Sequence, residues 1–145
     1  MLMKLIFIGK LKDRAIQSKC EEYIKRLRHY AKLEIVELSD SGVESEGKAI
    51  LRELEKERVR DFIVLTEEGK EFTSCQLSER LASSDRKLVF LIGGPYGIAP
   101  EIKAAANTLL SLSKLTFPHE IARLLLCEQL FRAVNIANGG SYHHE

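Results

Sequence analysis

The segment LVFLIGGPYGIAPE, Leu88–Glu101, decides how this chain folds. An apolar run that ends in glycine and proline is typical of a buried strand leading through a tight loop into a helix. Gly93 and Gly94 leave the backbone bare, so a ligand can lie against it, and Gly97 can adopt a positive φ. A strand-to-helix turn that needs glycine for its own sake is the alternative. The motif alone leaves both interpretations open.

A second segment, SLSKLTFPHE, Ser111–Glu120, has the same form and leads into a long apolar helix. Outward from these two segments, apolar runs and helical spacing predict strands and helices that alternate five times. The expected strands are 2–9, 33–39, 61–66, 87–93 and 109–115; the expected helices are 12–32, about 45–57, 73–84, 100–106 and 118–138. The polar stretch EEGKE, 67–71, is expected to be a loop.

This alternation predicts an α/β fold in which a mostly parallel sheet carries helices on both faces. No linker or repeat interrupts the chain, so residues 1–145 are expected to form a single domain. Ligands of such sheets bind at the carboxyl ends of the strands. Both proline-containing loops follow strands, and we expect them to lie together at that end.

The composition is that of an ordinary soluble protein, with 45% apolar and 30% charged residues. No apolar run could span a bilayer, and the first residues indicate a strand rather than a signal peptide. Three cysteines lie far apart, at 20, 75 and 127, without a C-x-x-C pattern. We therefore expect reduced thiols in a cytoplasmic protein, with no metal site and no membrane partner.

Charge is unevenly distributed along the chain, although the net charge is only +1. Residues 10–32 carry eight basic and three acidic side chains, whereas residues 34–57 carry eight acidic and three basic ones. The basic segment indicates either a polyanion-binding surface or a solvated helix face. Charge alone favours neither interpretation.

Common nucleotide and hydrolase motifs are missing. No G-x-x-x-x-G-K-[ST] loop occurs, no G-x-G-x-x-G follows the first strand, and no G-x-S-x-G is present. The last helix, by contrast, is apolar around its whole circumference. One face is expected to pack on a second copy of the chain, through residues such as Leu126 and Phe131. A central helix within one subunit is the alternative.

Three segments together resemble a known family. LIGGPYG, then LSLSKLTFPHEIARLLLCEQLFRA, then the terminal YHHE are similar to the RlmH family of ribosomal RNA methyltransferases, in the SPOUT class. The resemblance spans the whole chain. It implies a C-terminal trefoil knot, a homodimer, S-adenosylmethionine as cofactor and 23S ribosomal RNA within the ribosome as partner. The methyl group is expected to go to N3 of a pseudouridine.

The resemblance also implies two sets of site residues. The expected cofactor-binding residues come from three loops: Leu65, Gly93, Gly94, Ser113, Lys114, Leu115, Thr116, Phe117 and Pro118. The expected catalytic residues are Arg123, Tyr142, His143 and His144. Many relatives carry Arg or Lys where this chain has His144.

Methyl transfer from a sulfonium is an in-line displacement in which the enzyme mainly supplies orientation. The N3 proton must leave, so a base or a group that stabilises the anion is expected, and His143 and His144 are the adjacent candidates. A frayed terminus is the alternative, and deletion of the tail is expected to leave stability unchanged. A SPOUT enzyme acting on transfer RNA and a non-catalytic ribosome-binding module are the competing functions.

Overall fold

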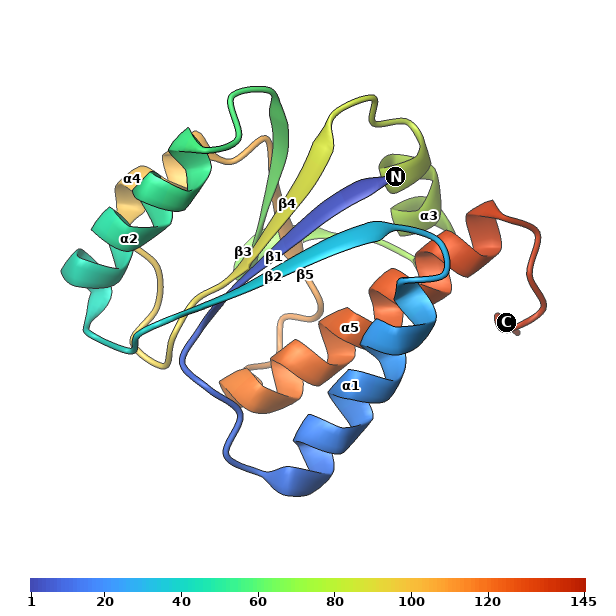
Figure 1. The fold of residues 1–145 in the computed structure, drawn as a ribbon, viewed down its shortest axis with the longest axis horizontal. Helices are drawn as coiled ribbons and strands as arrows, with labels where there is room; N and C mark the ends of the chain where they lie inside the picture. Colours follow the sequence, from blue (N-terminus) through green and yellow to red (C-terminus); the bar gives the residue numbers. More distant parts are fainter.

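Five parallel strands in the order β2-β1-β4-β3-β5 form the centre of the molecule (Figure 1). The computed structural model describes residues 1–145. The strands are β1 Leu2–Ile8, β2 Lys32–Leu38, β3 Arg60–Glu71, β4 Lys87–Ile92 and β5 Thr108–Ser111. The helices are α1 Arg14–Leu27, α2 Val43–Glu55, α3 Ser74–Ala82, α4 Pro100–Ala105 and α5 His119–Ala137. The predicted parallel α/β architecture is confirmed.

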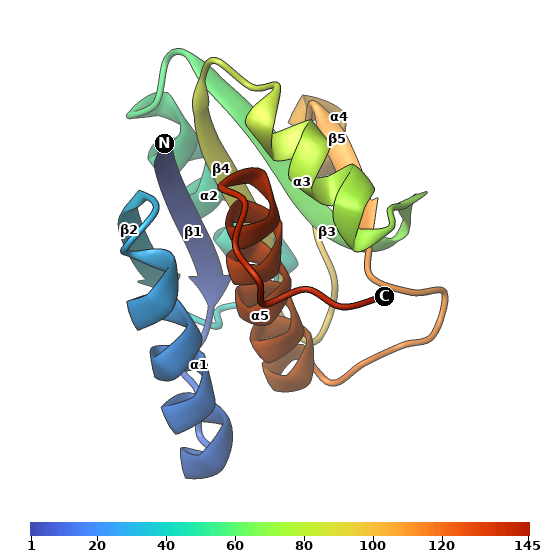
Figure 2. The same cartoon turned by 90° about the vertical axis from the view of Figure 1, so that its right-hand side faces the viewer.

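Helices cover both faces of the sheet. Helices α1, α3 and α5 lie on one face, and α2 and α4 lie on the other (Figures 1 and 2). The alternation of side chains along β1 supplies both layers: Leu5 and Phe7 belong to the larger core, whereas Ile6 and Ile8 belong to the smaller one. Thr73 is the N-cap of α3 and forms a capping box with Gln76.

Several predicted boundaries are wrong. The stretch 67–71 was expected to be a loop, but it belongs to β3, with the pairing register shifting between Leu65 and Lys70. The residues between them form a bulge, and Gly69 there passes so close to the backbone of Leu109 that a Cβ would collide with it. Strand β5 ends at Ser111 rather than 115, and α1 covers only 14–27 of the predicted 12–32. The trefoil knot stays a prediction.

Helix α5 lies between α1 and α3 and runs opposite to the strands (Figures 1 and 2). Leu126 and Phe131 are buried in the core of their own chain, so the expectation that they contact a second copy is wrong. The alternative, a central helix within one subunit, describes most of α5, because its neighbouring helices cover its flanks. Ile121 and Leu125 stay partly exposed on its outer side. No helix is both long enough and apolar enough to cross a membrane.

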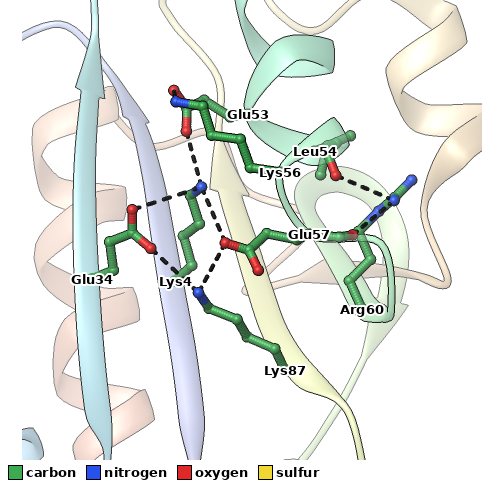
Figure 3. Close-up of polar contacts among 8 residues, drawn as sticks. All are labelled: Lys4, Glu34, Glu53, Leu54, Lys56, Glu57, Arg60 and Lys87. Atoms are coloured by element: carbon green, nitrogen blue, oxygen red, sulfur yellow. Dashed lines mark hydrogen bonds and ion pairs between the residues drawn. The ribbon is translucent and has the colours of Figure 1, made fainter.

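A buried ion cluster lies at the amino end of the sheet, beneath the end of α2 (Figure 3). Lys4 on β1 is 0% exposed, and its Nζ lies 2.9 Å from Glu53 Oε2 and 3.5 Å from Glu57 Oε1. Lys87 Nζ lies 2.9 Å from Glu57 Oε1 and 3.3 Å from Glu34 Oε1. Each charge in this cluster therefore has at least one partner of opposite sign.

Candidate functional site

A cavity of about 330 Å³ opens at the carboxyl ends of β3, β4 and β5. Three stretches of chain form its walls: the bulge of β3, the loop after β4, and the segment from β5 into α5. The lining residues are Leu65, Thr66, Glu67, Glu68, Ile92, Gly93, Gly94, Gly97, Ile98, Lys103, Leu112, Ser113, Leu115, Phe117, His119 and Ala122. The two proline-containing loops therefore meet around one space, as predicted from their place after strands of a parallel sheet.

The glycines of the loop after β4 are required by the protein's own packing. A Cβ on Gly93 would collide with the Ile98 side chain, and one on Gly94 would lie 3.0 Å from Ile8 Cγ2 and 3.2 Å from Glu46 Oε1. Gly97 has φ +94°, a left-handed conformation that favours glycine, and its N–H donates to Gly94 O at 3.1 Å. The strand-to-helix turn therefore needs these glycines for its own packing. Gly93, Gly94 and Gly97 also line the cavity, so a ligand can contact their backbone.

Six of the nine predicted cofactor-binding residues line the cavity, and three do not. The six are Leu65, Gly93, Gly94, Ser113, Leu115 and Phe117; the three are Lys114, Thr116 and Pro118, all exposed. Ser113, Leu115 and Phe117 line the cavity, whereas Lys114, Thr116 and Pro118 do not. That residues 113–118 all contact the cofactor stays a prediction.

Other residues at the cavity were missed or undervalued. His119, at the start of α5, lines the cavity but was not among the predicted site residues. Glu46 lies behind the glycine loop, is 4% exposed, and its Oε2 accepts from Ser41 N at 3.0 Å and Gly42 N at 2.7 Å. It joins the loop after β2 to the loop after β4. An acidic residue in the first turn of a helix was the signal that could have indicated it.

The C-terminal tail turns back and runs alongside α5 (Figure 2). The Tyr142 ring lies 4.7 Å from the Phe131 ring, and the Tyr142 hydroxyl donates to Glu128 Oε1 at 3.0 Å. Burial and the hydrogen bonds to Tyr23 and Glu128 raise the pKa of Tyr142 above its ordinary value. The tail is packed as far as His143, so the expectation that its deletion leaves stability unchanged conflicts with these contacts. His144 is exposed.

Arg123 lies at the other end of α5 from the tail. It is 8% exposed, its Nη2 lies 2.7 Å from Glu37 Oε2, and its guanidinium lies 3.9 Å from the centre of the Phe7 ring. At about 1.5 Å per residue, roughly 20 Å of helix separates Arg123 from the start of the tail. The tail folds back from there, and one chain places Tyr142 and His143 beside Glu128 and Arg132 in the middle of α5, where neither lines the cavity.

One group of side chains has the donor types of a metal site. Ligand atoms of Cys75, His143 and Glu145 lie within 4.8 Å of one another. However, Arg132 Nη1 lies 3.0 Å from His143 Nδ1, and arginine can only donate there. The neutral ring then carries its proton on Nε2, the atom that faces the other two groups. A protonated nitrogen cannot ligate a metal, so this arrangement does not fit one.

Only two of the basic side chains in residues 10–32 form ion pairs, Lys19 and Arg26. On α1, Lys19 and Arg26 form ion pairs with Glu22. Lys10, Lys12 and Arg14 are exposed and have no ion pair; they precede or begin α1 at the carboxyl end of the sheet. Glu120 Oε1 accepts from Lys12 N at 2.9 Å and from Asp13 N at 3.1 Å, which fixes this loop beside the start of α5.

Comparison with known proteins gives the family. The family described as "Predicted SPOUT methyltransferase" matches residues 1–143. Proteins named ribosomal RNA large subunit methyltransferase H are 41% identical in Gloeobacter violaceus, covering 99% of both chains, and 48% identical in Prochlorococcus marinus strain MIT 9211, covering 97% of this chain and 94% of that one.

Solved structures agree on the fold at low sequence identity. A probable methylase family protein from Haemophilus influenzae superposes with a TM-score of 0.58 at 10% identity, over 99% of this chain and 70% of its own. The SpoU methyltransferase AviRb from Streptomyces viridochromogenes, in complex with AdoMet, gives 0.52 at 12% identity, over 97% and 59%. With a matched fold, a full-length family match and close relatives of one name, the chain belongs to the SPOUT methyltransferase family.

Proposed function

We propose that this protein transfers a methyl group from S-adenosylmethionine to N3 of a pseudouridine in 23S ribosomal RNA, within the ribosome and as a homodimer. The observation that carries the proposal is the cavity at the carboxyl ends of three neighbouring strands, built from the loops in which the family resemblance predicts the cofactor. The name of the relatives, ribosomal RNA large subunit methyltransferase H, supports the class of acceptor.

The cavity fits the chemistry of S-adenosylmethionine. Its volume, about 330 Å³, lies within the usual range of small-molecule sites. Apolar side chains such as Leu65, Ile92 and Phe117 suit the faces of an adenine ring, and the backbone at Gly93 and Gly94 can pair with its edge. Glu67, which lines the cavity and has no ion pair, supplies negative charge for a cationic ligand.

The proposed catalytic tail needs a second subunit. In one chain, Tyr142 and His143 pack against the middle of α5 and do not line the cavity. A two-fold axis that packs two α5 helices side by side and antiparallel would bring each tail beside the partner's cavity. The partly exposed Ile121 and Leu125 on the outer side of α5 offer an apolar surface for this contact. We propose that Arg123, near the cavity end, then lies close to the incoming tail.

The chain's own residues would orient the acceptor and stabilise the charge that develops on it. Bound S-adenosylmethionine supplies the methyl group, and its sulfur keeps the electron pair of the broken bond and becomes a neutral thioether. The N3 nitrogen must lose its proton to the solvent before or during attack. The unpaired cations Lys10, Lys12 and Arg14 are proposed to contact RNA phosphates near the cavity.

Two other functions compete with this proposal. A SPOUT methyltransferase acting on transfer RNA would use the same cavity, and only the acceptor distinguishes it from the proposed enzyme. A non-catalytic ribosome-binding module would have no reason to keep an open cavity between three loops. Both alternatives predict that ribosomes are not methylated.

The test is transfer of a labelled methyl group from S-adenosylmethionine to three acceptors: ribosomes that lack the modification, free 23S ribosomal RNA, and transfer RNA. We expect label in ribosomes, and mass analysis of the digested RNA should assign it to N3 of a pseudouridine. Label only in transfer RNA, or donor binding without transfer to any acceptor, would favour one of the alternatives.

A further inference from the structure

Four side chains form a closely bonded cluster where the tail lies on α5. Arg132 Nη2 lies 2.6 Å and Arg132 Nε 3.0 Å from Glu128 Oε1, which makes a two-point pair one helical turn apart. The same carboxylate oxygen accepts the Tyr142 hydroxyl at 3.0 Å. The Arg132 guanidinium lies 4.6 Å from the centre of the Tyr142 ring, and its Nη1 reaches His143 Nδ1. Glu128 and Arg132 thus hold both tail side chains at once.

The contact at Nδ1 determines the protonation of the His143 ring. A guanidinium has only donors, so Nδ1 must accept, with Arg132 Nη1 at 3.0 Å. A doubly protonated ring would place two donors against each other, so this contact requires the neutral ring. Its single proton must then be on Nε2.

The Nε2–H group has no partner in the folded chain. Nε2 is buried and makes no hydrogen bond. The nearest acceptor, Glu145 Oε1, lies 3.6 Å away, too far for a hydrogen bond, and it accepts the Cys75 thiol at 3.3 Å instead. Glu145 is the last residue of the chain and is mostly exposed. A buried donor without a partner is unfavourable, and it suits a group that a ligand will satisfy when Glu145 moves aside.

We infer that Glu128 and Arg132 are positioning residues that hold His143 as its Nε2–H tautomer, so that His143 donates a hydrogen bond to a carbonyl oxygen of the acceptor base. The inference rests on the proposed function. When N3 loses its proton, the negative charge spreads to the two carbonyl oxygens that flank it. A donor aimed at one of them stabilises the anion that attacks the methyl group. His143 in this tautomer does not take the N3 proton, which leaves to water.

The experiment measures the His143 tautomer and the reaction in the same full-length protein. Nitrogen-15 NMR distinguishes a protonated Nε2 from a protonated Nδ1, with His143→Ala to assign the signal. We expect wild type to show protonated Nε2 and bare Nδ1. In Arg132→Gln the ring should become a mixture of tautomers, and kcat on ribosomes should fall by about 10² or more, as for loss of a charge-stabilising donor. The KM for S-adenosylmethionine should change little.

Two further variants separate positioning from charge and folding. Arg132→Lys keeps the charge but loses the two-point geometry, so it should restore only part of the rate. Arg58→Gln removes an exposed, unpaired arginine and should leave both tautomer and rate unchanged. A wild-type ring protonated on Nδ1, or Arg132→Gln with unchanged tautomer and rate, would overturn the inference. If no acceptor is methylated by wild type, the proposed function fails, while the NMR spectrum still decides the tautomer.

Discussion

The amino and carboxyl ends of the parallel sheet differ in the kinds of residues that surround them. At the amino end, Lys4 and Lys87 are enclosed by carboxylates, and each charge there is paired (Figure 3). At the carboxyl end, loops surround a cavity, and large apolar side chains such as Tyr96 and Leu115 stay exposed, Leu115 by 71%. One end pairs its charges within the chain, whereas the other surrounds an open cavity with backbone and apolar side chains.

This difference indicates how stability and function are divided in the molecule. Paired, enclosed charges specify one arrangement of β1, β2, β4 and α2, and they leave nothing for a ligand. The loops at the opposite end contain few such constraints, which is where parallel sheets bind ligands. Changes at the amino end should therefore alter stability without altering the site, and changes at the carboxyl end should do the reverse.

The tail belongs to neither end, because it folds back onto the middle of α5, yet it is proposed to act on the acceptor. Deleting Tyr142–Glu145 should reduce methylation of ribosomes by about 10³ or more, while S-adenosylmethionine binds as before. It should also lower the melting temperature, since Tyr142 packs on Phe131. His143→Ala should reduce activity without lowering the melting temperature. It should reduce activity more than His144→Ala does. Full activity of the truncated protein would show that the tail only packs.

Lys4→Met tests the amino end. Removing the buried ammonium leaves Glu53 and Glu57 enclosed with fewer partners, and breaking such a cluster costs about 3 kcal/mol in the free energy of unfolding. Urea unfolding measures this, and calorimetric titration should find donor affinity unchanged. Lys56→Met, which removes the exposed partner of Glu53, is the control and should change stability little. Weakened donor binding in folded Lys4→Met would contradict the division between the two ends.

Gly94→Ala tests the carboxyl end. The new Cβ would press on Ile8 and Glu46 and shift the loop toward the cavity, so donor affinity should fall about tenfold, near 1.4 kcal/mol. Gly94→Val would collide more severely and should destabilise the fold as well. Gly47→Ala is the control, because its Cβ lies 3.4 Å from Ala99, an ordinary contact. Unchanged donor affinity in Gly94→Ala would remove this glycine from the site.

The unpaired basic loop should affect the acceptor and not the donor. Lys10→Ala combined with Lys12→Ala should raise the KM for ribosomes severalfold and reduce the slope of log KM against log salt by about 1 to 2. Lys25→Ala with Lys32→Ala removes equal charge at the other end of α1 and should have a weaker effect. Equal effects of the two pairs would mean that only net charge matters.

Lowering the pH should reduce the stability that the ion pairs at the amino end contribute, by a small and gradual amount. A hydrogen bond from Lys56 is the main cause that lowers the pKa of Glu53 below 4.5, and Lys87 and Lys4 lower that of Glu57 although burial opposes them. A carboxyl group whose pKa is lower in the folded than in the unfolded protein stabilises the fold at pH values above its unfolded pKa. This contribution is lost as the pH falls through the folded pKa. The melting temperature should therefore decline as pH drops from about 5 through 4. A smaller decline in Lys4→Met would link it to this cluster.

The fold was predictable because its signals are local. Apolar runs, glycine and proline loops, and the Thr73 cap each depend on a few adjacent residues. The bulge of β3 was not predictable, since its residues are polar and pair with β5 only after a shift of register. The acidic excess of residues 34–57 had no explanation in the sequence. In the structure, three of those residues, Glu34, Glu53 and Glu57, surround Lys4 and Lys87.

The candidate site was predictable in outline but not in its individual side chains. Strand order places the loops of Leu65, Gly94 and Ser113 together, and the cavity contains all three. Which of residues 113–118 face it depends on the path of the loop, including the turn in which Leu115 N donates to Ser113 Oγ, and residue spacing does not reveal that path. The bonds of Arg132 to Glu128 and His143 likewise require the tail to fold back on α5, a tertiary event without a local signal.

The tail of each chain lines no part of that chain's cavity, and under the homodimer proposal this has a genetic consequence. A chain with a damaged cavity and a chain without its tail would each be inactive when alone. In a mixed dimer of the two, one site would combine both defects, whereas the other would combine an intact cavity with an intact tail. Co-expression of two inactive alleles should therefore restore up to half of the activity per dimer, a complementation that two defects within one chain could never produce.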